Sequence, residues 1–195
     1  MGERILILQG HPDPSPERFC RALASAYAQG ARGVGHEVRE FDLGAIDIPT
    51  LRSREEWENG SVPPVFAPLQ GHLQWCTHLL FVYPMWLGDL PAHTKAALEH
   101  VLRPGVGAPA RGHGPNDPRP LSGRSAHVVI TMGMPGFFYR WFYRAHSVKS
   151  LERNVLRFVG FSPVRHSLVG LAEADAPKHH ARWLQKLRVA GEQGR

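Results

Sequence analysis

The segment LLFVYPMWLGDLPAHTKAALEHVL, residues 79–102, determines which fold this chain can adopt. It begins with five consecutive apolar residues, Leu79 to Tyr83, a run that is typical of a strand buried on both faces. Pro84 has no N–H for a sheet ladder and ends the strand. Pro91 suits the first turn of a helix, and the apolar residues that follow it recur at helical spacing. The segment therefore predicts a strand, a short loop and a helix.

The same alternation of strand and helix extends along the chain. Four further strands are expected at Arg4–Gln9, His36–Asp42, Ser125–Thr131 and Pro163–Val169. Helices are expected after Ser15, over 69–76, over 91–102, over Ser147–Phe158 and over Ala174–Ala190, whereas 51–68 is expected to be irregular. Ser15 is interpreted as an N-cap and Pro16 as the first helical residue. Five strands alternating with five helices predict parallel strands with right-handed crossovers.

The loop after the first strand, GHPDPSPE, lacks the glycine fingerprint of dinucleotide-binding domains. This favours the other doubly wound arrangement, a five-stranded parallel sheet of order 2-1-3-4-5 with helices on both faces. The fold class is thus α/β, a three-layer sandwich, and we expect a single domain over residues 1–195. In this topology the loops after strands 1 and 3 face each other across a crevice.

Composition limits the class of protein. The chain has 195 residues, of which 43% are hydrophobic and 21% charged, as in an ordinary globular domain. No apolar run approaches the roughly 20 residues that span a bilayer. Its two cysteines, Cys20 and Cys76, lack CxxC partners, and the first residues lack the pattern of a signal peptide. We therefore expect free thiols in a reducing compartment and a cytoplasmic location.

The formal net charge is +6, but the basic residues are scattered and no block of five like charges occurs. No nucleic-acid motif is present, so a nucleic-acid partner is not expected. The basic surface instead favours anions such as phosphate-bearing cofactors.

Three loops suggest one elongated ligand. His11, Ser15 and Arg18 provide donors around a helix start that suits a phosphate, although Ser15 could serve only as a cap. The loop that begins at Pro84 contains Trp86, which is either a flat platform or ordinary core. The loop TMGMPG after the fourth strand has two glycines that allow close backbone approach, or it is a simple turn.

Four pieces of the chain, in order, carry a family resemblance: ILILQGHPDPSPERFCRALA, YPMWLGDLPAHTKAALEHV, VVITMGMPGFFYRW and AHSVKSLERNVLRFVGF. Through them the chain resembles the flavodoxin-like NAD(P)H-dependent oxidoreductases, the group that contains the NAD(P)H quinone reductases and the potassium-efflux ancillary proteins. The second piece, in which YP-x-W-x-G-x-x-P precedes Lys95, is the most specific.

The resemblance implies a bound flavin, FMN or FAD, and NAD(P)H as co-substrate. It implies that the phosphate end is held by His11, Ser15, Arg18 and Phe19. It implies that the flavin ring lies between Pro84, Met85, Trp86 and Leu87 on one side and Thr131, Met132 and Gly133 on the other. Tyr139 and His146 lie close to the positions of the Tyr and His that face the flavin in quinone reductases, with the His spacing one residue longer here, although Tyr139 also suits ordinary aromatic packing. Here TMGM replaces the usual TTGG, and Cys20 replaces the usual Asn.

The expected activity is therefore that of an NAD(P)H dehydrogenase of the quinone type. Hydride would pass from NAD(P)H through the flavin to a quinone or similar flat acceptor, by a ping-pong mechanism in a homodimer. One alternative is a flavin-binding regulatory subunit of a membrane cation-efflux system, with a membrane transporter as partner. A remoter one is a zinc-dependent deacetylase that uses His11 and Asp13, but Pro14 stands where that class has a second acidic residue.

Overall fold

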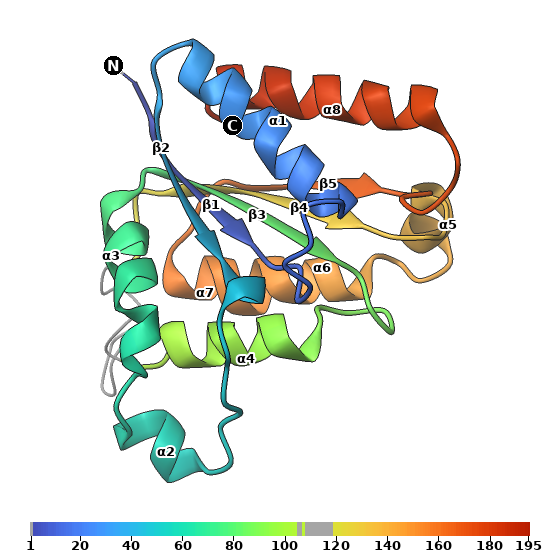
Figure 1. Ribbon diagram of the computed structural model, residues 1–195. Helices are drawn as coiled ribbons and strands as arrows, with labels where there is room; N and C mark the ends of the chain where they lie inside the picture. Colours follow the sequence, from blue (N-terminus) through green and yellow to red (C-terminus); the bar gives the residue numbers. More distant parts are fainter. Residues whose placement is uncertain (1, 105–106, 108–118) are drawn as a thin grey trace.

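The computed structural model describes residues 2–104, 107 and 119–195, and its centre is a five-stranded parallel sheet. The strands are β1 (Arg4–Gln9), β2 (Glu37–Asp42), β3 (His78–Pro84), β4 (Ser125–Thr131) and β5 (Val164–Val169). They lie in the order β2-β1-β3-β4-β5, with every neighbouring pair parallel (Figure 1). The fold class and strand order predicted from the sequence are confirmed.

Strand β3 lies at the middle of the sheet and is buried along its whole length, as its apolar run predicts. One hydrophobic core lies on each face. Side chains such as Phe81 and Val128 belong to the larger core, whereas Leu80 and Val129 belong to the smaller one. The alternation of neighbouring strand residues between the two cores explains why no polar residue interrupts the centre of this strand.

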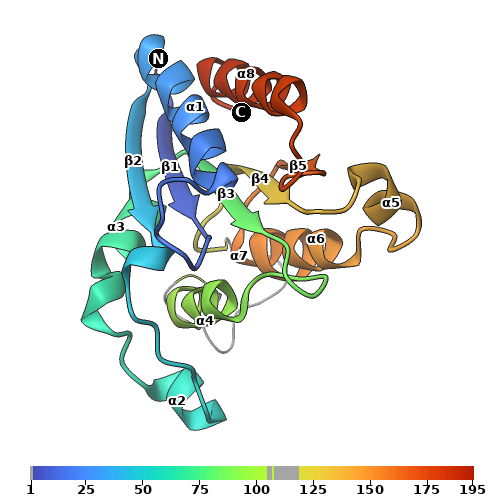
Figure 2. The same ribbon diagram turned by 45° about the vertical axis from the view of Figure 1, so that its right-hand side comes forward.

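Helices cover both faces of the sheet (Figures 1 and 2). On one face lie α1 (Phe19–Gly33) and α8 (Pro177–Glu192). On the other lie α3 (Ala67–Trp75), α4 (Ala92–Val101), α6 (His146–Ser150), the π-helical η3 (Leu151–Leu156) and α7 (Arg157–Val159). Two short helices, α2 (Arg54–Asn59) and α5 (Gly136–Trp141), project from the edges of this arrangement (Figure 2). The short 3-10 turns η1 (Leu43–Ala45) and η2 (Pro64–Phe66) complete the chain.

The start of the first helix was predicted wrongly. Helix α1 begins at Phe19, its N-cap is Arg18, and no side chain caps it. Ser15 instead opens a β-turn, closed by the Arg18 N–H donating to the Ser15 carbonyl at 3.3 Å, in which Pro16 takes the second position that proline favours. The prolines thus favour a turn before the helix, and Ser15 is not an N-cap.

The segment 51–68 is not wholly irregular, because it contains α2 and η2. The Ser53 hydroxyl caps α2 by accepting from the Glu56 N–H at 3.0 Å. A Ser followed three residues later by Glu is the sequence signature of such a cap. Helix α5 was also not predicted, so the expected count of five helices is wrong.

The expected helix Ser147–Phe158 corresponds to the continuous run of α6, η3 and α7. Phe158, expected on its apolar face, is 49% exposed, and Val159 is buried instead. The π-helical turns shift the register, because each contains more residues than an α-helical turn.

The prediction of a functional or mobile loop at Arg103–Arg124 falls largely on residues 105–106 and 108–118, outside the described residues. Within the described part of the chain, no helix is long and apolar enough to cross a bilayer.

Candidate functional site

A pocket of about 400 Å³ opens at the carboxyl ends of β3 and β4. This volume lies within the range of pockets that hold small organic ligands. Its lining comes from the loops after the two strands, from α5 and from the segment that follows α5: Met85, Leu87, Gly88, Met132, Gly133, Met134, Tyr139, Tyr143 and His146. The wall is mostly apolar, so the pocket suits a flat, largely hydrophobic ligand.

Backbone hydrogen bonds fix the loop after β3. The Met85 N–H donates to the Thr131 carbonyl at 2.8 Å, which joins this loop to the end of β4. Trp86 and Asp89 then exchange backbone hydrogen bonds of 2.9 and 3.0 Å around a two-residue turn. Leu87 and Gly88 have φ of +48° and +83°, the left-handed pair that a type I′ hairpin requires. The rigid turn presents the exposed Leu87 side chain at the pocket.

The loop after β4 is held in the same way. The Met132 N–H donates to the Val169 carbonyl at 2.9 Å, and the Ala172 N–H donates to the Met132 carbonyl at 3.0 Å. A Cβ atom added at Gly133 would meet only the Glu173 carboxylate, at 3.8 Å. Gly133 therefore leaves open space at the wall of the pocket.

Four of the seven residues predicted to hold the flavin ring line the pocket: Met85, Leu87, Met132 and Gly133. The other three, Pro84, Trp86 and Thr131, are not among the lining residues. Pro84 is buried within β3, and the Thr131 hydroxyl contacts the Cys20 sulfur at 3.1 Å. The half-exposed Trp86 meets the His11 ring edge-on, with 6.0 Å between ring centroids.

The two residues predicted as catalytic both line the pocket but differ in exposure. Tyr139 is buried, and its hydroxyl shares a 2.6 Å hydrogen bond with the Ser147 hydroxyl and accepts from the Val148 N–H at 3.3 Å. His146 is exposed at the rim. Three further lining residues were not predicted: Gly88 and Met134 lie in the two loops that the sequence indicates, whereas Tyr143 follows α5.

The loop after β1 is organised around Asp13. One Asp13 carboxylate oxygen accepts from the Ser15 N–H at 2.8 Å, and the other accepts from the Arg18 guanidinium at 2.7 Å. The Asp13 N–H donates to His11 Nδ1 at 3.0 Å. Burial and the nearby Arg18 charge lower the pKa of His11, so its ring is neutral at pH 7. His11, Ser15 and Arg18 are thus brought together, each in contact with Asp13.

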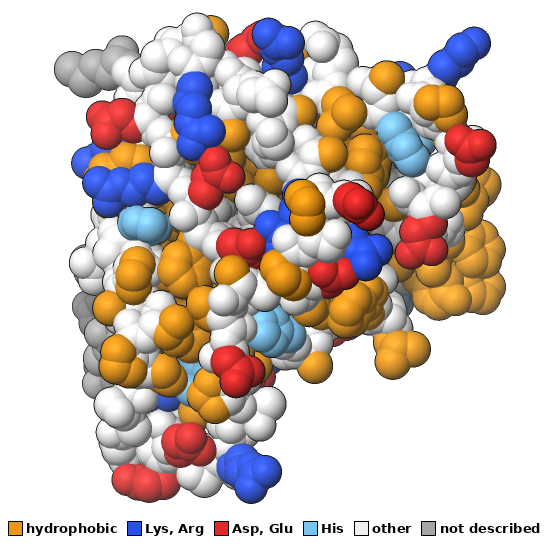
Figure 3. Space-filling model, viewed as in Figure 1, with side chains coloured by type: hydrophobic (Ala, Val, Ile, Leu, Met, Phe, Trp, Pro, Cys, Tyr) orange, Lys and Arg blue, Asp and Glu red, His pale blue; other side chains and the backbone are white. Residues whose placement is uncertain are grey.

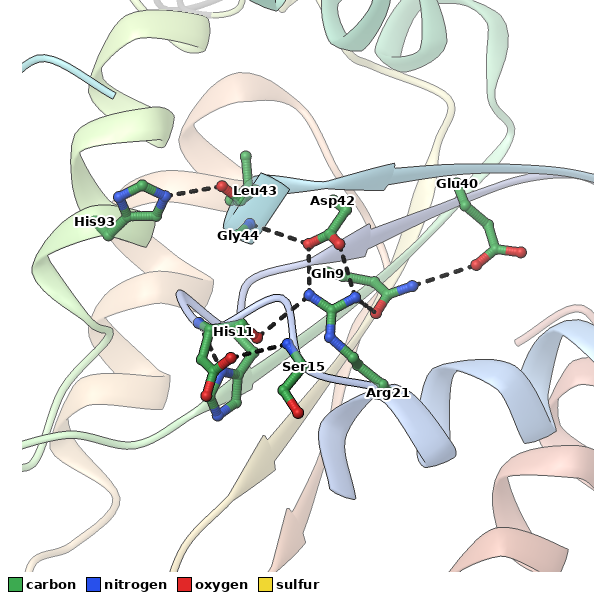
Figure 4. A network of polar contacts seen from close by, with 10 residues as sticks. Gln9, His11, Ser15, Arg21, Glu40, Asp42, Leu43, Gly44 and His93 are labelled. Atoms are coloured by element: carbon green, nitrogen blue, oxygen red, sulfur yellow. Dashed lines mark hydrogen bonds and ion pairs between the residues drawn. The ribbon is translucent and has the colours of Figure 1, made fainter. Parts of the chain in front are cut away.

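Arg21 of α1 joins this loop to the end of β2 (Figure 4). Its guanidinium donates to both carboxylate oxygens of Asp42, at 2.7 and 2.9 Å, and to the carbonyl of Asp13 at 3.3 Å. A fourth bond of 3.3 Å reaches the Gln9 side chain at the end of β1. Arg21 and Asp42 were not predicted as part of the site. Their signal was an Asp at the end of the second strand, opposite Gln9 at the end of the first strand, and an Arg near the start of the helix that follows the first strand.

Phe19 and the two cysteines contribute to packing. The Phe19 ring packs against His180 of α8, with 4.4 Å between ring centroids. Cys20 and Cys76 are buried free thiols, and burial raises the pKa of each to about 11. Both thiols are protonated near neutral pH and unreactive.

Exposed aromatic side chains gather on and just after α5, beside the pocket, at the right of the space-filling view (Figure 3). The members are Phe137, Phe138, Trp141, Phe142 and Tyr143. Trp141 is 80% exposed and Phe137 is 70% exposed. Among the described residues, no group of three or more His, Cys, Asp or Glu side chains is arranged to hold a metal ion.

Comparison with known proteins agrees with this architecture. The model of a family described as having a flavodoxin-like fold matches residues 3–189. A curated relative, a ribosyldihydronicotinamide dehydrogenase-like protein of Penicillium crustosum, is 22% identical over 85% of this chain and 67% of its own length.

Two solved structures are also similar. An NAD(P)H:quinone oxidoreductase from Methanothermobacter marburgensis has a TM-score of 0.81 at 24% identity, over 99% of this chain and 97% of that one. An FMN-dependent NADH-azoreductase from Bacillus anthracis, solved with FMN, has a TM-score of 0.73 at 12% identity, over 97% and 98% of the two chains.

Proposed function

The chain belongs to this flavodoxin-like family, and from that premise we propose that it is a flavin-dependent NAD(P)H oxidoreductase that reduces a quinone or similar flat acceptor. The observation that carries the proposal is the apolar pocket where β3 and β4 end, the edge at which open α/β sheets bind ligands. The names of the similar proteins, a quinone oxidoreductase, an azoreductase and a dehydrogenase-like protein, point to the same chemistry.

The residues present fit a flavin. The mostly apolar pocket matches a flat ring, and Gly133 leaves room at its wall. Met85 and Leu87 on one side, with Met132 and Gly133 on the other, would hold the ring. The donors of the Ser15–Arg18 turn and of the neutral His11 would hold the phosphate end.

When bound, a flavin supplies two-electron hydride chemistry between NAD(P)H and the acceptor. The chain supplies position and hydrogen bonds. The exposed His146 at the rim can donate a proton or a hydrogen bond to an acceptor oxygen. The Tyr139 hydroxyl is engaged with Ser147, so we assign its ring to the wall and its hydroxyl to holding the segment that carries His146.

The residues that would hold the flavin ring line this one pocket, so donor and acceptor would both reach the ring there and use the pocket in turn. This supports a ping-pong mechanism. The test is steady-state reduction of a soluble quinone by NADH or NADPH with protein reconstituted with FMN or FAD. Parallel double-reciprocal lines are expected, and converging lines would contradict the ping-pong order. Tight flavin binding with negligible NAD(P)H turnover would instead favour the regulatory-subunit alternative.

We propose further that two copies pair through the aromatic surface on α5. Phe137, Trp141 and Phe142 are each more than two-thirds exposed. Monomers rarely leave such a contiguous apolar patch open to water. The patch adjoins the pocket through Tyr143, so a partner would border the entrance. Light scattering should give twice the chain mass for the wild type and a single chain mass for Trp141→Glu; a wild-type monomer would contradict the proposal.

A further inference from the structure

Asp13 places a negative charge among the donors assigned to the phosphate. Its carboxylate accepts from the Ser15 N–H and the Arg18 guanidinium, and its backbone N–H donates to the His11 ring. Both of its carboxylate oxygens are used. A phosphate held by the same donors would share them with Asp13 and lie beside a like charge.

The charge on Asp13 is present throughout the working pH range. Hydrogen bonds from the Ser15 N–H and the Arg18 guanidinium hold the pKa of Asp13 below its ordinary value. Arg18 is half exposed and its charge is already matched by Asp13, so the pair adds little net attraction for an anion.

Resting on the proposed flavin site, we propose that Asp13 selects among flavins by the charge on the phosphate group that enters this loop. It disfavours the doubly charged phosphomonoester of FMN more strongly than the singly charged phosphodiester groups of FAD, and it leaves riboflavin, which has no phosphate, unaffected.

The expected size of the effect follows from simple electrostatics. A phosphomonoester carries a charge of about −1.5 to −2 at pH 7. Two unit charges roughly 6 Å apart in a water-exposed setting change a binding constant by about threefold, and a double charge squares that factor to about tenfold. Asp13→Asn keeps an oxygen for the Ser15 N–H and removes the charge. It should tighten FMN binding about tenfold and FAD binding about threefold.

The experiment measures dissociation constants of the full-chain apoprotein for FMN, FAD and riboflavin by flavin fluorescence at low salt. It compares the wild type with Asp13→Asn and Glu37→Gln. Glu37 is an exposed carboxylate at the start of β2, at the opposite end of the sheet from the site, and the described structure has no hydrogen bond or ion pair for its side chain, so it controls for a change in overall charge. An unchanged riboflavin constant shows that Asp13→Asn leaves the ring pocket intact.

The inference is supported if the ratio of the FMN constant to the FAD constant falls about threefold in Asp13→Asn and stays constant in Glu37→Gln. It is overturned if Asp13→Asn leaves the ratio unchanged, weakens FMN binding, or acts no more strongly than Glu37→Gln. Those results leave the proposed function standing, because flavin still binds. If the wild type binds none of the three flavins, the proposed function fails and this inference fails with it.

Discussion

The two halves of the site are built by different means. The loops after β3 and β4 are fixed by backbone hydrogen bonds, such as the one from Met85 to Thr131, and present apolar side chains to the pocket. The loop after β1 is fixed by charged side chains, with Asp13 bound to Arg18 and Arg21 bound to Asp42. The first half should therefore respond to changes of shape, and the second to changes of charge and salt.

The largest expected effect is steric. Gly133→Leu adds a side chain at the open wall of the pocket and should weaken binding of every flavin by at least about a hundredfold, the loss expected when an overfilled site must rearrange by a few kcal/mol. The unfolding free energy should change little, because Gly133 is exposed. Gly71→Leu, at an exposed position of α3 with open space around its Cα, is the matched control and should leave flavin affinity unaltered. Equal affinities for the two variants would place the ligand elsewhere.

The next effect tests the charged half. Arg21→Gln removes a guanidinium that is only 14% exposed and leaves the Asp42 carboxylate, 27% exposed, without its partner. We expect a loss of about 2 kcal/mol in unfolding free energy, below the 3–5 kcal/mol typical of fully buried pairs, measured by urea denaturation.

Arg32→Gln is its control, because it breaks the exposed pair between Arg32 and Glu40 and should cost about 0–1 kcal/mol. If the two variants lose the same stability, the loop after β1 does not depend on Arg21.

A smaller effect is expected at Tyr139. Tyr139→Phe removes the hydroxyl that forms a hydrogen bond with the buried Ser147 and should lower the unfolding free energy by about 1–1.5 kcal/mol, measured by urea denaturation.

His146 should instead affect the reaction. Because we assign proton donation to His146, His146→Gln should slow the acceptor half-reaction about tenfold or more without changing stability. The rate at which a quinone reoxidises the reduced flavin, measured by stopped flow, distinguishes the His146→Gln variant from the Tyr139→Phe variant. A double variant that is reoxidised at the normal rate would show that neither residue takes part in the mechanism.

The smallest effect is the response to salt. Raising ionic strength from about 0.05 to 0.5 M shortens the screening length and weakens the repulsion between Asp13 and the phosphate, so it should tighten FMN binding a few-fold and FAD binding less. Riboflavin, which uses only the apolar half, should bind with constant affinity. A riboflavin constant that varies as strongly as that of FMN would contradict the division of the site.

The sequence allowed one half of the site to be predicted better than the other, for a physical reason. The run at β3 and the glycines after β4 place their loops directly, because strand burial and turn geometry are local properties. The β1 loop depends on pairing between distant residues. Arg21 and Asp42 meet only because β1 and β2 are parallel neighbours. The turn at Ser15 resembles a helix start in sequence, and only the bonds of Asp13 and Arg18 distinguish the two.

The decisive measurement is the visible spectrum of the purified, flavin-reconstituted protein, recorded without oxygen before and after addition of NADPH or NADH. We expect oxidised-flavin bands, perturbed from those of the free cofactor, that bleach when the nicotinamide is added. A chain that cannot be reconstituted with FMN or FAD, or whose bound flavin does not bleach with either nucleotide, would contradict the proposed function.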